Sequence, residues 1–178
     1  SDSWVVLPQV IWGASYQLFS YTYSGNARNN QYAMIYSAFD SNNIVIKNKL
    51  GVVQKNFTLN AGETYLQAGL ALDMTGWTVT ATNKIGVIVG VNCANSGVGA
   101  CDNIDEMLLP TTMLGTKYYV PNGANNTTYV MANQAGTTVK IDGVIVATLA
   151  NSGDVYSFNV LVTDLKILET NFKTTVWQ

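Results

Sequence analysis

The side chains that most often perform chemistry are missing from this sequence or stand alone. Histidine, the commonest general base and zinc ligand, is absent, which removes every Ser-His and Cys-His nucleophile pair. Ser15 lies two residues after a glycine, but no second glycine completes a nucleophile elbow around it. We therefore expect no catalytic residue, no metal ligand and no cofactor. A carboxylate- or metal-dependent hydrolase is kept only as a third alternative.

The densest group of carboxylates consists of Asp102, Asp105 and Glu106. A hard cation such as Ca²⁺ needs several oxygen ligands, and this spacing does not match an EF-hand loop. Acidic side chains are also favoured in the first turn of a helix, where a residue such as Asp102 can cap free N–H groups. We therefore predict a short helix over residues 103–109, ended by Pro110, and leave the cation site as the alternative.

The two cysteines, Cys93 and Cys101, bracket a short segment rich in small residues and glycine. Such a segment lets the chain fold back until the two thiols lie within bonding distance. We expect a disulfide, which would stabilise the fold by roughly 2–3 kcal/mol on the chain-entropy model. Because disulfides persist in oxidising compartments, we expect the chain to be extracellular or displayed at a cell surface.

One segment combines aromatic, amide and cationic side chains in an expected loop. Residues 21–31 contain the sole arginine of the chain, and tyrosine, serine, glycine and asparagine are the residues that adaptable recognition loops favour. An ordinary solvated hairpin loop would have a similar composition. The residues we select as candidate ligand-binding residues are Tyr21, Tyr23, Asn26, Arg28 and Asn29.

The composition excludes two classes of partner. Hydrophobic residues make up 48% of the chain and charged residues 11%, with a net charge of −2 and no cluster of either sign. Nucleic-acid binding requires clustered cations that displace counterions from phosphates. The longest apolar stretch, residues 85–91, is far shorter than the roughly 20 residues that span a bilayer. The chain opens at Ser1 without a signal peptide, which we interpret as a mature product or an excised domain.

The sequence contains an internal duplication. Residues 7–13 match residues 109–115, and Tyr16 and Tyr118 each follow three residues after the final glycine. Further matches keep the same order: residues 32–34 with 129–131, 43–47 with 138–142, 62–63 with 153–154, and 82–83 with 170–171. We predict a first half over residues 1–91, a disulfide-bearing connector over residues 92–106 and a second half over residues 107–178, which could form one pseudo-symmetric domain.

Both halves have the pattern of β-strands. Short runs rich in β-branched and aromatic residues alternate with turn signals about every 8–15 residues, which is typical of a sandwich or barrel. Asp142-Gly143 between two apolar runs predicts a two-residue hairpin with a type I′ turn. The fold class we predict is all-β: a duplicated antiparallel β-sandwich with at most one short helix in the connector.

The connector also carries a family resemblance. Asn92-Cys93-Ala94, residues 101–110, Leu114-Gly115 and residues 118–121 resemble the amino-terminal domain of IgG-Fc-binding proteins, a family found in secreted mucin-like proteins and in many bacterial surface proteins. Within the family motif, Asn103 stands where histidine is frequent and Met107 stands where glutamine is frequent. The resemblance covers residues 60–178 directly and the first half through the duplication.

The resemblance implies an extracellular, non-catalytic adhesion or recognition domain. We expect a glycan or protein on a target cell as the partner, bound through exposed loops, for example at the tip of an adhesive fibre. A homo-oligomer such as a trimer would suit that setting. The alternative is a structural spacer or self-assembly module with no external ligand.

Overall fold

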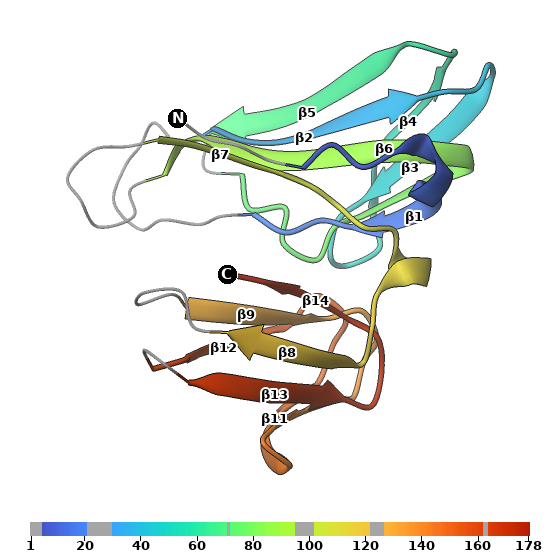
Figure 1. Ribbon diagram of the computed structural model, residues 1–178. Helices are drawn as coiled ribbons and strands as arrows, with labels where there is room; N and C mark the ends of the chain where they lie inside the picture. Colours follow the sequence, from blue (N-terminus) through green and yellow to red (C-terminus); the bar gives the residue numbers. More distant parts are fainter. Residues whose placement is uncertain (1–4, 21–29, 71, 95–101, 122–126, 162–163) are drawn as a thin grey trace. The chain divides into compact units, whose positions relative to one another are not determined.

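A computed structural model describes residues 5–20, 30–70, 72–94, 102–121, 127–161 and 164–178 (Figure 1). The chain divides into two compact units, Ser1–Thr112 (unit 1) and Met113–Gln178 (unit 2). Strands pair antiparallel throughout the described ranges, and the helical segments there are two short 3₁₀ turns, Gln9–Ile11 and Thr111–Met113. No helix in these ranges is long and apolar enough to cross a membrane. The predicted all-β class is confirmed.

Unit 1 is organised by one strand of 17 residues, β6. Its first part pairs with β1 and β3, and its second part pairs with β2 and β7, so that β6 belongs to both layers of the unit. β4 extends the first layer beyond β3, and β5 extends the second layer beyond β2. The strands are β1 (Gly13–Gln17), β2 (Asn30–Ser37), β3 (Asn42–Lys47), β4 (Val53–Leu59), β5 (Thr64–Leu70), β6 (Thr78–Ala94) and β7 (Asp102–Met107).

Unit 2 repeats this strand order in two separate sheets. One sheet has the order β11-β10-β13-β8 and the other β12-β9-β14. β13 and β14 therefore stand where the two parts of β6 stand in unit 1, and the predicted duplicated sandwich is confirmed. The strands are β8 (Lys117–Pro121), β9 (Thr127–Ala132), β10 (Thr137–Ile141), β11 (Val144–Leu149), β12 (Val155–Asn159), β13 (Leu165–Thr170) and β14 (Thr174–Trp177).

The two units share a hydrogen-bonded tyrosine in their first strand. In each, a glycine N–H donates to the hydroxyl of the tyrosine three residues later, and that hydroxyl donates to a backbone carbonyl of a later strand. The residues are Gly13, Tyr16 and Ile85 in unit 1 and Gly115, Tyr118 and Thr174 in unit 2. The glycine-to-tyrosine distance is 2.9 Å in both. We call this arrangement the tyrosine clamp.

One of the sequence matches is displaced by two residues. Ser37 pairs with Ile85 in unit 1, and Ala132 pairs with Thr174 in unit 2. Since Ile85 and Thr174 accept the equivalent clamp bonds, Tyr36 rather than Met34 is the counterpart of Met131. The error has a simple cause: side chains alternate with a period of two along a strand, so a two-residue shift keeps every residue on its face.

The core of each unit lies between its two layers. In β2, buried and half-buried residues alternate from Gln31 to Ser37, as expected for a strand with one face on the core. The core of unit 2 contains these buried residues: Val120, Val130, Ala132, Val139, Leu149, Val160 and Leu168. Their burial removes apolar surface from water and supplies the main stabilisation of that unit.

The predicted hairpin is confirmed and the predicted helix is wrong. Asp142 and Gly143 both have positive φ, at 50° and 82°, as a type I′ turn requires, and Ile141 pairs with Val144 beside them. Residues 102–107, by contrast, form strand β7 along β6. Acidic residues after Asp102 would suit a helix locally, but a helix this short is marginal by itself, and the β6 edge offers a ladder of backbone hydrogen bonds.

Candidate recognition site

The strands that border the predicted recognition loop meet at one end of unit 1 (Figure 1). β2 begins at Asn30, which pairs with Leu70 at the end of β5. The last residue of β6, Ala94, pairs with Asp102 at the beginning of β7. Asn30, Ala94 and Asp102, which adjoin segments 21–29 and 95–101, therefore lie at the same end of the sheet, which we call the loop end of unit 1.

The candidate ligand-binding residues lie outside the described ranges. Tyr21, Tyr23, Asn26, Arg28 and Asn29 all belong to segment 21–29, so their binding role stays a prediction. What the structure gives is the anchor of that segment: the Asn30 N–H donates to the Asn92 side-chain oxygen at 2.9 Å, and the neighbouring Gln31 is buried.

The expected disulfide also stays a prediction. Cys93 is a buried residue of β6, whereas Cys101 lies outside the described ranges. The pairing of Ala94 with Asp102 places the immediate neighbours of the two cysteines side by side.

A polar cluster crosses three strands at the loop end. Tyr32, Gly90 and Asp105 pair in one row across β2, β6 and β7. The Tyr32 hydroxyl donates to one oxygen of the Asp105 carboxylate, and the Asn103 amide donates to the other at 2.5 Å. A Cβ atom on Gly90 would lie 2.6 Å from the Tyr32 ring, so only glycine leaves room for the tyrosine to reach the carboxylate.

This cluster gives Asp105 a structural role. Asp105 and Glu106 are adjacent in a strand, so their side chains point to opposite faces of the sheet and do not converge on one ion. Among the described residues, no group of three or more His, Cys, Asp or Glu side chains could hold a metal. Sequence reasoning missed Tyr32 because its partner Asp105 is 73 residues away in the chain, and it missed Gly90 because that residue matters only through its place between the two.

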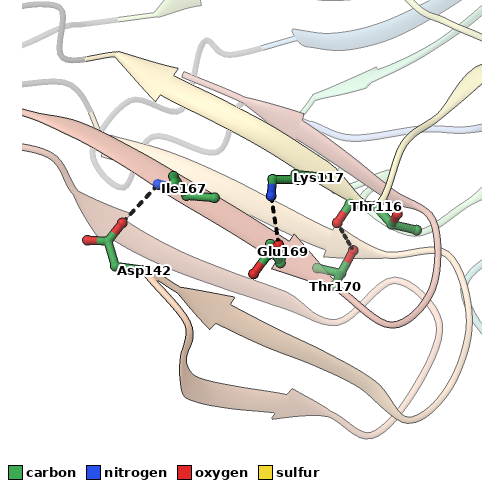
Figure 2. A network of polar contacts seen from close by, with 6 residues as sticks. All are labelled: Thr116, Lys117, Asp142, Ile167, Glu169 and Thr170. Atoms are coloured by element: carbon green, nitrogen blue, oxygen red, sulfur yellow. Dashed lines mark hydrogen bonds and ion pairs between the residues drawn. The ribbon is translucent and has the colours of Figure 1, made fainter.

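Unit 2 carries a surface network of ion pairs and backbone bonds (Figure 2). Lys117 and Glu169 lie 3.1 Å apart on paired strands, and the hydrogen bond and charge of Glu169 raise the pKa of Lys117. The Asp142 carboxylate accepts from the Ile167 N–H at 3.0 Å and pairs with Lys166 at 3.1 Å. These two partners, the backbone N–H first, lower the pKa of Asp142.

In Figure 2 the Asp142–Ile167 bond fastens the β10–β11 hairpin to β13, and the Lys117–Glu169 pair joins β8 to β13. All four charged groups are matched by an opposite charge at close range. Exposed pairs of this kind contribute little to stability and offer no uncompensated charge for a ligand. The loop end of unit 1 is therefore the better candidate for recognition.

Comparison with known proteins agrees with the motif in the connector. The family described as IgGFc binding protein matches residues 2–174, which extends the resemblance over both units. The human protein named IgGFc-binding protein is 35% identical over 95 residues, which are 51% of this chain and 2% of that relative. The chain thus spans a small fraction of the length of the relative it matches. No solved structure is significantly similar. The expected family is confirmed, and this chain belongs to the IgGFc-binding protein family.

Proposed function

We propose that this chain is an extracellular recognition domain that binds a protein or glycan through the loop end of unit 1. The observation that carries the proposal is the family match over residues 2–174, since the name of the human relative describes a protein that binds another protein. The partner of this chain is proposed as a macromolecule on a target cell or in the extracellular fluid.

The geometry of the loop end supports this site. Binding loops work best when a rigid scaffold presents them, because less conformational entropy is lost on binding. Here β2, β6 and β7 are fastened by the Tyr32–Asp105–Asn103 cluster directly beside the ends of segments 21–29 and 95–101. A disulfide between Cys93 and Cys101 would hold the second segment in the same way.

A binding screen tests the proposal. The full chain is immobilised and probed with immunoglobulin G Fc fragment, with a glycan array and with extracellular matrix proteins. We expect saturable binding to one of these probes that Tyr23→Ala or Arg28→Ala weakens at least tenfold, the effect of losing about 1.4 kcal/mol. Lys84→Ala is the matched control, because Lys84 is an exposed residue next to Ile85, which pairs with Ser37 at the end of β2 opposite Asn30.

The alternative is a spacer or self-assembly module. A spacer would leave every probe unbound while the folded chain remains intact, and that outcome would reject the recognition proposal. Binding that persists in both loop variants would keep recognition but move it away from segment 21–29. The fibre-tip setting and the homo-oligomer belong to the same proposal, and light scattering on the full chain tests the homo-oligomer.

A further inference from the structure

Among the sheet edges in the described ranges, the β5 edge differs from the others. Proteins usually protect exposed edges with charges, prolines, bulges or short strands, because free N–H and C=O groups can pair with another chain. β4 carries Lys55 and a bulge, β7 carries Asp105 and Glu106, and β8 carries Lys117 and Pro121. β1 and β11 contain bulges, and β12 and β14 have only 5 and 4 residues.

β5 has none of these protections. Its seven residues, Thr64–Leu70, contain no charge and no proline, and they pair with β2 in continuous register without a bulge. Leu66 is an apolar residue with 55% of its surface exposed. β5 is also the terminal strand of its layer (Figure 1). A long, regular, uncharged edge of this kind is suited to accept a further strand.

The hydrogen bonds to β2 determine which groups of β5 remain available. The Ser37 N–H donates to the Glu63 carbonyl. This bond determines which residues of β5 turn their backbone groups toward β2. In an antiparallel pair, alternate residues turn their N–H and C=O toward the partner. Tyr65, Gln67 and Gly69 therefore bond to β2, and the backbone groups of Leu66 and Ala68 point away from the sheet.

We propose that β5 pairs antiparallel with β5 of a second copy of this chain, with Gln67 opposite Gln67. This register places Leu66 opposite Ala68 of the other copy. The outward-pointing N–H and C=O groups of Leu66 and Ala68 in one copy then bond to those of Ala68 and Leu66 in the other. It also places Tyr65 opposite Gly69 of the other copy. Leu66 and Tyr65 thus each meet a small residue, Gln67 meets its own copy, and no like charges face each other. The pairing is two-fold symmetric and closes as a dimer.

The size of the contact sets the expected strength. One edge of seven residues buries less surface than the roughly 1,200–2,000 Å² typical of stable complexes. The dimer is therefore a reversible one that forms at high concentration or between neighbouring copies on a surface. Analytical ultracentrifugation of the full chain from about 1 μM to about 1 mM should show a concentration-dependent rise in mass toward two copies. A monomer over the whole range would overturn the proposal.

Substitutions locate the contact. Leu66→Lys puts a charge on the edge, and Ala68→Pro removes an outward N–H that β2 does not use, which edge strands tolerate. Both variants should stay monomeric while keeping the melting behaviour of the parent. Leu50→Lys is the control for the same chemical change, because Leu50 is 86% exposed outside β5, and it should dimerise normally. Dimerisation of Leu66→Lys and Ala68→Pro at the parental concentration would overturn the proposal.

A cysteine variant tests the register directly. Gln67→Cys should form a disulfide-linked dimer under mild oxidation, since two residues facing each other in a non-hydrogen-bonded pair bring their Cβ atoms close. Leu50→Cys should not cross-link faster than random collision allows. Equal rates for the two variants would reject this register. This experiment does not involve segment 21–29, so its result is independent of the proposed recognition function.

Discussion

Tyr16 and Tyr118 hold the same position in the two units but differ in burial. Tyr16 is 1% exposed and Tyr118 is half-buried. Burial raises the pKa of Tyr16, so its hydroxyl stays protonated and can donate to Ile85 while it accepts from Gly13. Phenylalanine would leave both backbone groups of this clamp without their partner.

We expect Tyr16→Phe to lower the free energy of unfolding by about 1–3 kcal/mol, the cost of leaving buried polar groups unsatisfied. Tyr118→Phe should cost less, because water can reach the freed groups of a half-buried clamp. Urea denaturation of both variants measures the difference. Equal losses, or no loss for Tyr16→Phe, would show that the clamp does not carry this energy.

Gly90 must lack a side chain because a Cβ atom at this position would collide with Tyr32 and Asp105, which are in contact above its Cα. Gly90→Ala should displace the tyrosine from the carboxylate and destabilise the chain by about 1–3 kcal/mol, the usual cost of overpacking. Gly115→Ala is the matched control, because the nearest atom to its added Cβ would be at an ordinary 3.5 Å. The two melting curves give the comparison, and similar curves would contradict this role for Gly90.

At the scale of elements, short sequence motifs correctly predicted those structures that depend on interactions between neighbouring residues. The β10–β11 hairpin follows from Asp142-Gly143, because two positive φ angles favour those residue types. β7 could not be predicted in this way, since its conformation depends on pairing with β6. The Tyr32–Asp105 contact and the fastening of the loop end depend on the same long-range pairing and were invisible in the sequence for the same reason.

The hairpin also has a predictable pH dependence. The lowered pKa of Asp142 means that its ionised form is favoured in the folded state. The resulting stabilisation is present above the ordinary carboxyl value of 3.8 and is lost as the pH falls through the lower folded value. Asp142→Asn keeps a residue that tolerates positive φ but removes the charge. We expect it to melt at a slightly lower temperature than the parent at pH 7, with the difference vanishing in acid.

Lys166→Met separates the two causes of that pKa shift. The hydrogen bond from the Ile167 N–H is the largest single cause of the shift, so Lys166→Met should keep part of the pH dependence that Asp142→Asn abolishes. Melting temperatures of the three proteins between about pH 2 and pH 7 give the answer. Loss of the whole pH dependence in Lys166→Met would mean that the ion pair, not the backbone bond, lowers the pKa.

At the scale of the whole molecule, the duplication was visible in the sequence because turn and clamp residues recur in order. The role of β6 was not visible. In unit 1 the single strand β6 belongs to both layers. In unit 2 the corresponding positions are taken by two strands, β13 in one sheet and β14 in the other. Asn171 to Lys173 separate β13 from β14, whereas Thr82 and Asn83 at the matching place lie within the continuous strand β6. Whether a strand continues or breaks is decided by its neighbours on both sides.

Since unit 2 has its own buried cluster, we expect residues 113–178 to fold alone. Domains near 60 residues bury only about 60% of the surface of their unfolded chain and are marginally stable. Truncation of a single core side chain should therefore unfold the isolated unit. Leu168→Ala, at a position with 0% exposure, removes about 2–5 kcal/mol and should abolish the cooperative melting of the isolated unit. Leu165→Ala, at a position 56% exposed on the same strand, should leave it intact. If the parental fragment shows no cooperative transition by circular dichroism, unit 2 depends on unit 1 for its fold.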